Sequence, residues 1–231
     1  MQLHELGTWE QLQKKLTWMQ LGEFTGRTIL EFGCGNGVMG AHYAAENKVV
    51  AIEPNEQTLK DNPYENVEQI CGDIKKLADF ADGSFDVILC HNVLEYAVER
   101  PEVLKEFQRL LKPDGFISIL KHNRPGRIMQ MAVLLNNFEH AGELLDGKDG
   151  NSPQYGSIRY YEDDDLIRWA PELKIENILG MRTFWDLQQS QEIQKDENWQ
   201  EQMMELEQRV SDIEIYKNIA FFHHVFLRNK R

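Results

Sequence analysis

The sequence has few cysteines and no long apolar run. Its three cysteines, Cys34, Cys71 and Cys90, lie singly in apolar, strand-like segments, without the close pairing of zinc sites or disulfide frameworks. We therefore expect three buried small hydrophobic residues and no metal site. The N-terminal segment lacks a signal-peptide core, and no apolar run reaches the length of a membrane span. These absences predict a cytoplasmic protein without a membrane partner.

Basic residues are also scarce. The 25 Lys and Arg residues face 38 Asp and Glu residues, a net charge of −13, which opposes approach to a nucleic-acid backbone before any contact forms. A nucleic-acid partner would therefore have to meet a local basic patch. With 231 residues, 42% of them hydrophobic, the chain can build one sizeable core, and we predict a single domain over residues 1–231.

Short β-branched runs alternate with helix-like stretches between residues 28 and 120, as in strand-helix-strand units around a parallel sheet. The predicted strands are residues 28–32, 48–52, 67–71, 85–90 and 116–120. The predicted helices between them are residues 38–46, 56–61 and 100–111, and the last ends at a proline- and glycine-containing turn, 112–115.

The flanking segments add helices and two further strands. Apolar residues at helical spacing predict a helix over residues 9–21. Beyond residue 120 we predict a helix at 128–138, a loop at 142–156, a helix at 162–169, a strand at 174–182, a polar helix at 188–210 and a strand at 220–227. The last two strands pair antiparallel in this prediction.

The most informative segment is a strand that runs into three alternate glycines and then a helix. The glycines are Gly33, Gly35 and Gly37, and such residues let the backbone turn sharply and approach a ligand closely. Glu53 ends the second strand, about twenty residues beyond the first glycine, where a carboxylate can bind both ribose hydroxyls of a nucleoside. The nicotinamide-dinucleotide fingerprint requires a glycine where this chain has Val38.

This Glu-x-Gly-x-Gly-x-Gly spacing resembles motif I of the class I S-adenosylmethionine-dependent methyltransferases. Two further segments are similar to that family: residues 72–74, where an acidic side chain meets the adenine amino group, and residues 85–96, beside the methionine moiety. The resemblance implies an α/β, Rossmann-like fold with a mixed seven-stranded sheet, a reversed C-terminal hairpin strand and helical additions. It also implies S-adenosylmethionine as cofactor and S-adenosylhomocysteine as product.

The resemblance implies a division of the chain into a helical extension (1–27), a cofactor-binding core (28–120) and substrate-side elements (121–231). The cofactor-binding residues that it implies are Glu31, Gly33, Cys34, Gly35, Gly37, Glu53, Pro54, Asp73, Ile74, Cys90 and His91. Three of these have structural alternatives: Glu53 as a turn cap, Asp73 as a helix N-cap and Glu31 as a satisfied buried acid. A protein that binds the cofactor without catalysis also stays open.

Candidate acceptor-side residues follow the fourth and fifth strands. His91 is a candidate general base, with a backbone contact to the cofactor as its alternative. The basic stretch 121–127 can receive a phosphate or carboxylate, or can be a solvated loop that caps the next helix. Arg182 is a second anion-binding candidate, with a structural ion pair as its alternative. The substrate-binding candidates are Tyr96, His122, Asn123, Arg124 and Arg182.

The second half of the chain resembles a narrower family, the bacterial tRNA 5-carboxymethoxyuridine carboxyl methyltransferases. The similar segments are residues 91–96, 123–126, 137–142, 152–155, 182–184 and 224–225. This resemblance implies that a carboxylate on a wobble uridine of tRNA accepts the methyl group as an ester. The chain departs from the family at Phe221 and in its sparse N-terminal basic residues (Lys14, Lys15 and Arg27), which keeps a small-molecule acceptor as the alternative. No oligomeric state is predicted.

Overall fold

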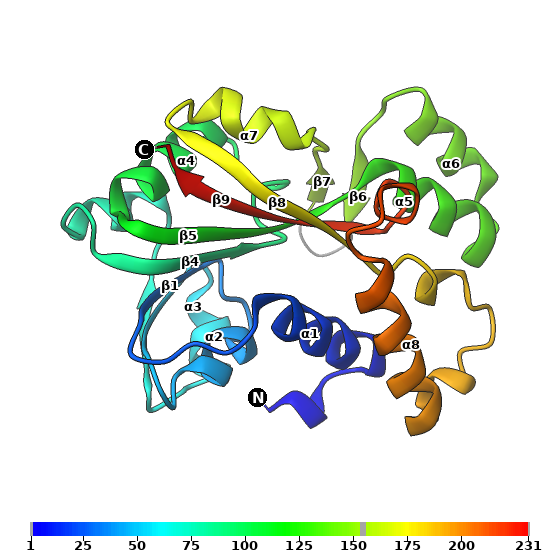
Figure 1. Cartoon of the computed structure of the whole chain (residues 1–231), viewed down its shortest axis with the longest axis horizontal. Helices are drawn as coiled ribbons and strands as arrows, with labels where there is room; N and C mark the ends of the chain where they lie inside the picture. The colour runs from blue at the N-terminus through cyan, green and yellow to red at the C-terminus, as the bar shows by residue number, and fades with distance from the viewer. Residues whose placement is uncertain (1, 153–155, 231) are drawn as a thin grey trace.

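The computed structural model describes residues 2–152 and 156–230. A seven-stranded sheet in the order β3-β2-β1-β4-β5-β9-β8 forms its centre (Figure 1). The strands are β1 (Thr28–Phe32), β2 (Lys48–Glu53), β3 (Val67–Cys71), β4 (Phe85–His91), β5 (Leu111–His122), β8 (Leu173–Met181) and β9 (Phe222–Asn229).

The first five strands run parallel, and β9 lies antiparallel between β5 and β8. The mixed sheet with its reversed C-terminal strand is thus confirmed. Ile29, Leu30, Ile88 and Leu89 are fully buried on both faces of the central strands, because helices cover a parallel sheet on either side. This double burial explains why these strands read as continuous apolar runs.

Helices form two layers around the sheet (Figure 1). α4 (Arg100–Leu110) and α7 (Asp163–Trp169) cover one face, where Leu104, Phe107 and Leu166 join the main hydrophobic core. α1 (Thr8–Leu21), α2 (Val38–Tyr43) and α8 (Glu197–Val210) cover the other face. A short helix, α3 (Glu56–Asp61), and a 3-10 turn, η2 (Ile74–Asp79), follow β2 and β3.

A third group of elements extends beyond the carboxyl ends of β4 and β5. It contains α5 (Arg124–Met129), the π-helical turn η3 (Gln130–Leu134), α6 (Phe138–Leu145) and the hairpin β6 (Gly150–Ser152) and β7 (Gly156–Ile158). The remaining pieces are η1 (Leu3–Glu5), η4 (Trp185–Leu187), η5 (Ile193–Lys195) and α9 (Glu214–Lys217). Within residues 2–152 and 156–230, no helix combines the length and apolarity needed to cross a membrane.

The predicted turn at residues 112–115 is wrong, because β5 already begins at Leu111. Phe85 pairs with Leu111 and Val87 with Phe116, so the extra residues form a bulge inside the strand. Asp86 stabilises this bulge by accepting from Lys112 Nζ at 2.7 Å and from Thr28 N at 2.8 Å. Pro113 and Gly115 therefore lie in a bulge within β5, and they do not separate α4 from a strand that begins after them.

Four other local predictions need correction. The loop predicted at 142–156 contains the end of α6 and the strands β6 and β7, apart from residues 153–155, which lie outside the described residues. The helix predicted at 128–138 is split between α5, η3 and α6, and the helix predicted at 188–210 begins at Glu197. Cys71 is exposed, whereas Cys34 and Cys90 are buried as predicted.

Candidate functional site

The glycine loop joins the end of β1 to α2 and is fixed to β2. The backbone N–H groups of Gly33 and Cys34 both donate to Ile52 O, at 2.8 and 3.1 Å. Gly33 has a φ of 73°, and a Cβ atom there would lie 2.4 Å from Val93 Cγ2, so glycine is required. A Cβ atom on Gly35 would meet nothing within 4 Å, which leaves open space beside the loop.

Glu53 lies at the end of β2 beside this loop. Its carboxylate accepts from Gly35 N at 3.0 Å and from Asn55 N at 3.1 Å. The second bond is the turn-capping role considered from the sequence, and the first ties the carboxylate to the central glycine. The structure therefore brings an acidic side chain and a close-approach loop together at the carboxyl end of the sheet, where open α/β sheets bind ligands.

Glu31, which is buried, and Lys14, which is half-buried, are two ionisable side chains near the glycine loop. Glu31 accepts from Gly40 N at 3.0 Å, and burial raises the pKa of its carboxyl to about 7, although the nearby Lys14 acts in the opposite direction. Burial lowers the pKa of Lys14, against the attraction of Glu31 and Glu10. Lys14 forms no ion pair within residues 2–152 and 156–230, and the sequence pattern did not single it out as a ligand-binding residue.

The segment after β3 has a clear structural role. Asp73 accepts from Lys75 N at 2.9 Å and so caps η2, which begins at Ile74. This is the N-cap alternative. The cap uses one carboxylate oxygen, Oδ1, so capping and an adenine contact are compatible. Pro54 lies in the turn after β2, where its carbonyl accepts from Cys71 Sγ at 3.7 Å.

His91 ends β4 on the face covered by α1, and Cys90 points into the opposite core. His91 Nε2 lies 2.8 Å from Ser118 Oγ. Burial, with smaller contributions from His224 and Lys14, holds the pKa of His91 well below its usual range. The imidazole is therefore neutral near pH 7. The structure places it next to β5, at the carboxyl end of the parallel strands.

A buried carboxylate pairs with His122 at the end of β5. Glu95 Oε1 accepts from His122 N at 2.7 Å and lies 3.0 Å from His122 Nδ1. Burial favours a higher pKa for Glu95, but the hydrogen bonds from His122 outweigh it, and the pKa lies below its usual range. The sequence pattern did not predict this pairing of Glu95. Its true partner is 27 residues away and needed the fold to be seen.

Asn123 and the backbone of Tyr96, the next two acceptor-side candidates, accept or donate hydrogen bonds that hold neighbouring segments together. Asn123 donates to Asn218 O at 3.0 Å and Ala220 O at 2.8 Å, which fixes the chain after β5 against the start of β9. The carbonyl of Tyr96 accepts from Arg159 at 2.9 Å. No group of three or more His, Cys, Asp or Glu side chains in the described part of the chain is arranged to hold a metal ion.

Arg124 and Arg182 both donate to partners within the chain, although Nε of Arg182 is buried without a hydrogen-bond partner. Arg124 donates to Leu144 O at 3.3 Å and Lys148 O at 2.7 Å. Arg182 lies just past β8 and forms a buried ion pair with Asp186 at 2.6 Å, besides a 2.9 Å hydrogen bond to Gln13. The structural alternative for Arg182 is therefore present in the fold, although its guanidinium also lies 4.6 Å from the Phe221 ring centroid.

Arg127, on α5, is different. Its guanidinium donates to Gln130 Oε1 and lies 5.6 Å from the same Phe221 ring, but it has no carboxylate partner in the described chain. Its Nε, like that of Arg182, is buried without a hydrogen-bond partner. Burial lowers the pKa of Arg127 and Arg182 adds to this effect, while Tyr160 and Asp186 act in the opposite direction. A guanidinium without a carboxylate partner of its own therefore lies between α5 and the start of β9.

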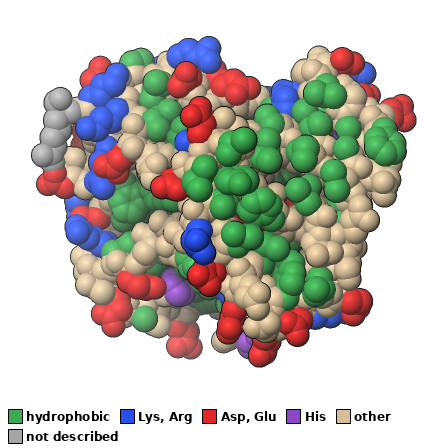
Figure 2. Space-filling model, turned by 45° about the vertical axis from the view of Figure 1, so that its right-hand side comes forward, with side chains coloured by type: hydrophobic (Ala, Val, Ile, Leu, Met, Phe, Trp, Pro, Cys, Tyr) green, Lys and Arg blue, Asp and Glu red, His purple; other side chains and the backbone are tan. Residues whose placement is uncertain are grey.

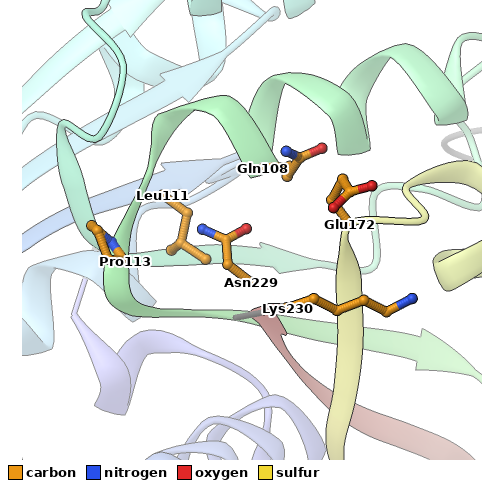
Figure 3. A pocket seen from close by; sticks show the side chains of 6 residues that line it. All are labelled: Gln108, Leu111, Pro113, Glu172, Asn229 and Lys230. Atoms are coloured by element: carbon orange, nitrogen blue, oxygen red, sulfur yellow. The ribbon is translucent and has the colours of Figure 1, made fainter.

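A separate cavity of about 270 Å³ lies far from these groups along the strands. Figure 3 shows its lining side chains, which include Leu111 at the first residue of β5 and Asn229 at the last residue of β9. Because β9 runs antiparallel to β5, both positions mark the amino end of β5. Ligands of open α/β sheets bind at the carboxyl ends, so this cavity is not the candidate site.

Comparison with known proteins gives the class of protein. Residues 30–119 match the family model described as a methyltransferase domain. The chain is 27% identical to the rat thiol S-methyltransferase TMT1B over 62% of this chain and 66% of that protein. It is also 27% identical to the ubiquinone biosynthesis O-methyltransferase of Thiobacillus denitrificans, over 72% of this chain and 73% of that protein.

Solved structures share the fold. The PH0226 protein of Pyrococcus horikoshii matches with a TM-score of 0.60 at 13% identity, over 96% of this chain and 90% of that one. The 1,6-didemethyltoxoflavin-N1-methyltransferase of Burkholderia thailandensis, crystallised with its acceptor and S-adenosylhomocysteine, matches with a TM-score of 0.54 at 14% identity, over 94% and 76% of the two chains.

The strand order, the glycine loop and these matches together define a class I, Rossmann-like methyltransferase fold. The chain contains an S-adenosylmethionine-dependent methyltransferase domain. The predicted fold, enzyme class and cofactor are thereby confirmed.

Proposed function

We propose that the chain transfers the methyl group of S-adenosylmethionine to an oxygen atom of an acceptor that carries a carboxylate. The observation that carries this proposal is the guanidinium of Arg127, which has a buried Nε without a hydrogen-bond partner and no carboxylate partner in the described residues. Burying a charge without a partner is costly, and a carboxylate that accepts from Nε would satisfy it. Arg182, which is paired with Asp186, lies over the same aromatic ring, so a second guanidinium is close to an anion beside Arg127.

The donor side of the proposal uses the glycine loop and its neighbours. The open space beside Gly35 accepts the cofactor backbone, and Glu53 lies within reach of the ribose hydroxyls. The unpaired ammonium of Lys14 suits the carboxylate of the methionine moiety, while Asp73 and Ile74 suit the adenine. S-adenosylmethionine supplies an electrophilic methyl carbon, and the residues of this chain bind, orient and exclude water around it.

A carboxylate acceptor needs little further chemistry. Its oxygen is already ionised near pH 7, so its lone pair attacks the methyl carbon, the carbon–sulfur bond breaks, and its electron pair stays on sulfur. The products are a methyl ester and S-adenosylhomocysteine. The role left for the protein is alignment, for which a guanidinium is well suited because its planar donors bind one carboxylate in a defined geometry.

We propose a small organic acid as the acceptor. The net charge of −13 opposes an RNA backbone, and on the face shown in Figure 2 apolar side chains gather in the centre, whereas most basic side chains lie toward the left edge. The relatives that act on thiol and ubiquinone-pathway compounds are consistent with a small acceptor. The carboxylate of a modified tRNA wobble uridine is the second candidate, supported by the matching segments around residues 91–96 and 182–184.

The test compares two acceptor pools from cells that lack this protein. Purified protein and methyl-labelled S-adenosylmethionine are incubated with total tRNA or with a small-molecule extract, and Arg127→Gln is run beside the wild type. Label in the extract that depends on Arg127 supports the small-acid proposal. Label confined to tRNA moves the function to the wobble uridine, and label that Arg127→Gln incorporates at the normal rate contradicts the anion site.

A further inference from the structure

A chain of four polar side chains crosses the sheet face below α1. Gln20 Oε1 on α1 lies 2.9 Å from His224 Nδ1 on β9, and His224 Nε2 lies 2.6 Å from Ser118 Oγ on β5. Ser118 Oγ in turn lies 2.8 Å from His91 Nε2 at the end of β4. Ser118 and His224 are fully buried, so no water competes for these bonds.

The direction of the first bond is fixed by the amide of Gln20. Its Nε2 donates to Gly180 O at 2.9 Å, so its Oε1 faces His224. An amide oxygen only accepts, and therefore Nδ1 of His224 carries the hydrogen. Burial lowers the pKa of His224 to about 3, so this ring is neutral near pH 7 and its Nε2 has a bare lone pair.

The hydrogen bond between Ser118 and His224 in turn determines which ring nitrogen of His91 carries the hydrogen. Its hydroxyl has one hydrogen, which it donates to the bare Nε2 of His224. The Ser118 oxygen must then accept from His91, so the hydrogen of His91 lies on Nε2. The opposite tautomer would leave Ser118 between two acceptors and one buried nitrogen unsatisfied, a loss that corresponds to a tautomer ratio of about 5 to 150.

We propose that Gln20, His224 and Ser118 are positioning residues that hold His91 as the Nε2–H tautomer and leave its Nδ1 lone pair as an acceptor at the end of β4. In residues 2–152 and 156–230, Nδ1 of His91 has no hydrogen-bond partner. The consequence for catalysis rests on the proposed function: His91 accepts a hydrogen bond from a bound ligand and does not donate one.

The test reads the tautomer directly, without any ligand. Long-range proton–nitrogen correlation spectra of protein with ¹⁵N-labelled histidine distinguish protonated from bare ring nitrogens. In the wild type we expect a single Nε2–H tautomer for His91 and an Nδ1–H tautomer for His224. In Ser118→Ala, His91 becomes a tautomer mixture while His224 keeps its hydrogen on Nδ1.

A second pair of variants tests transmission from α1. Gln20→Glu keeps an acceptor for His224 and retains the His91 tautomer, whereas Gln20→Leu removes it and lowers the tautomer ratio of both histidines severalfold. Thr17→Val, one turn earlier, is the matched control: it loses a buried hydroxyl bond to Gln13 O outside the chain of contacts and leaves both tautomers unchanged.

Either of two results overturns the proposal: His91 with its hydrogen on Nδ1 in the wild type, or a His91 tautomer that Ser118→Ala and Gln20→Leu leave unaltered. If Ser118→Ala does not fold, the His91 tautomers of Gln20→Glu and Gln20→Leu test the proposal instead. Because these spectra need neither cofactor nor acceptor, they stand even if the acceptor differs from the proposed acid. With an acceptor in hand, Ser118→Ala lowers kcat about tenfold and leaves KM within twofold, as expected for loss of one buried hydrogen bond.

Discussion

Replacing Glu53 by alanine tests the donor site. Glu53 accepts from Gly35 N at 3.0 Å, and we propose that it binds the ribose hydroxyls of the cofactor. Hydrogen bonds to an ionised carboxylate are worth about 1.5 to 3 kcal/mol. Since each 1.36 kcal/mol is a factor of ten, Glu53→Ala is expected to raise the Kd for S-adenosylhomocysteine about 10- to 150-fold in a calorimetric titration.

Two matched variants separate this contact from general charge effects. Glu56→Ala removes the same charge three residues later, from an exposed ion pair with Lys60, and is expected to leave the Kd within twofold. Glu53→Gln keeps one acceptor oxygen for the loop and is expected to lie between the other two variants. An unchanged Kd in Glu53→Ala, or an equal loss in Glu56→Ala, refutes the ribose assignment.

Three further predictions concern the acceptor side and the fold. Arg127→Gln is expected to keep normal cofactor affinity but lower kcat/KM about 10- to 100-fold, and weaker cofactor binding in titrations would contradict this. Gly126→Ala is expected to destabilise the fold by about 3 kcal/mol in urea unfolding, because its Cβ atom would lie 2.1 Å from Ala220 O; Gly142→Ala, with nothing within 4 Å, serves as control. Asp163, whose partners lower its pKa from 3.8 to about 2 despite burial, stabilises the fold above pH 4 by about 2 kcal/mol. Asp163→Asn is therefore less stable at pH 7, and a gap that did not shrink between pH 4 and pH 2 would contradict the assignment.

The sheet was predictable because parallel strands buried on both faces are continuous apolar runs. Such runs mark β1, β2 and β4 in the sequence, and the observed strands begin where they were expected. The start of β5 was missed because Pro113 and Gly115 suggest a turn. Only the pairing of Phe85 with Leu111, held by Asp86, shows that the ladder continues through them.

Some features of the candidate site also follow from the sequence, whereas others depend on tertiary contacts. Gly35 lies in the loop after β1 and Glu53 ends the neighbouring strand β2, so their proximity follows from the order of elements. Glu95 lies in the segment after β4 and His122 ends β5, and the two meet through a tertiary contact that local spacing does not encode. The distinction between Arg127 and Arg182 also depends on tertiary partners, since only the second has a buried carboxylate within 4 Å. The sequence pattern alone therefore predicts a basic stretch, but it does not show which of its residues lacks a carboxylate partner.

The measurement that tests the central claim most directly is the chemical stability of the transferred methyl group. Methyl-labelled product is isolated after one incubation with the small-molecule extract and treated with mild alkali. Release of the label as methanol is the predicted result, because a methyl ester hydrolyses under these conditions. Label that survives the treatment would show an ether, thioether or amine product, and would contradict a carboxylate acceptor beside Arg127.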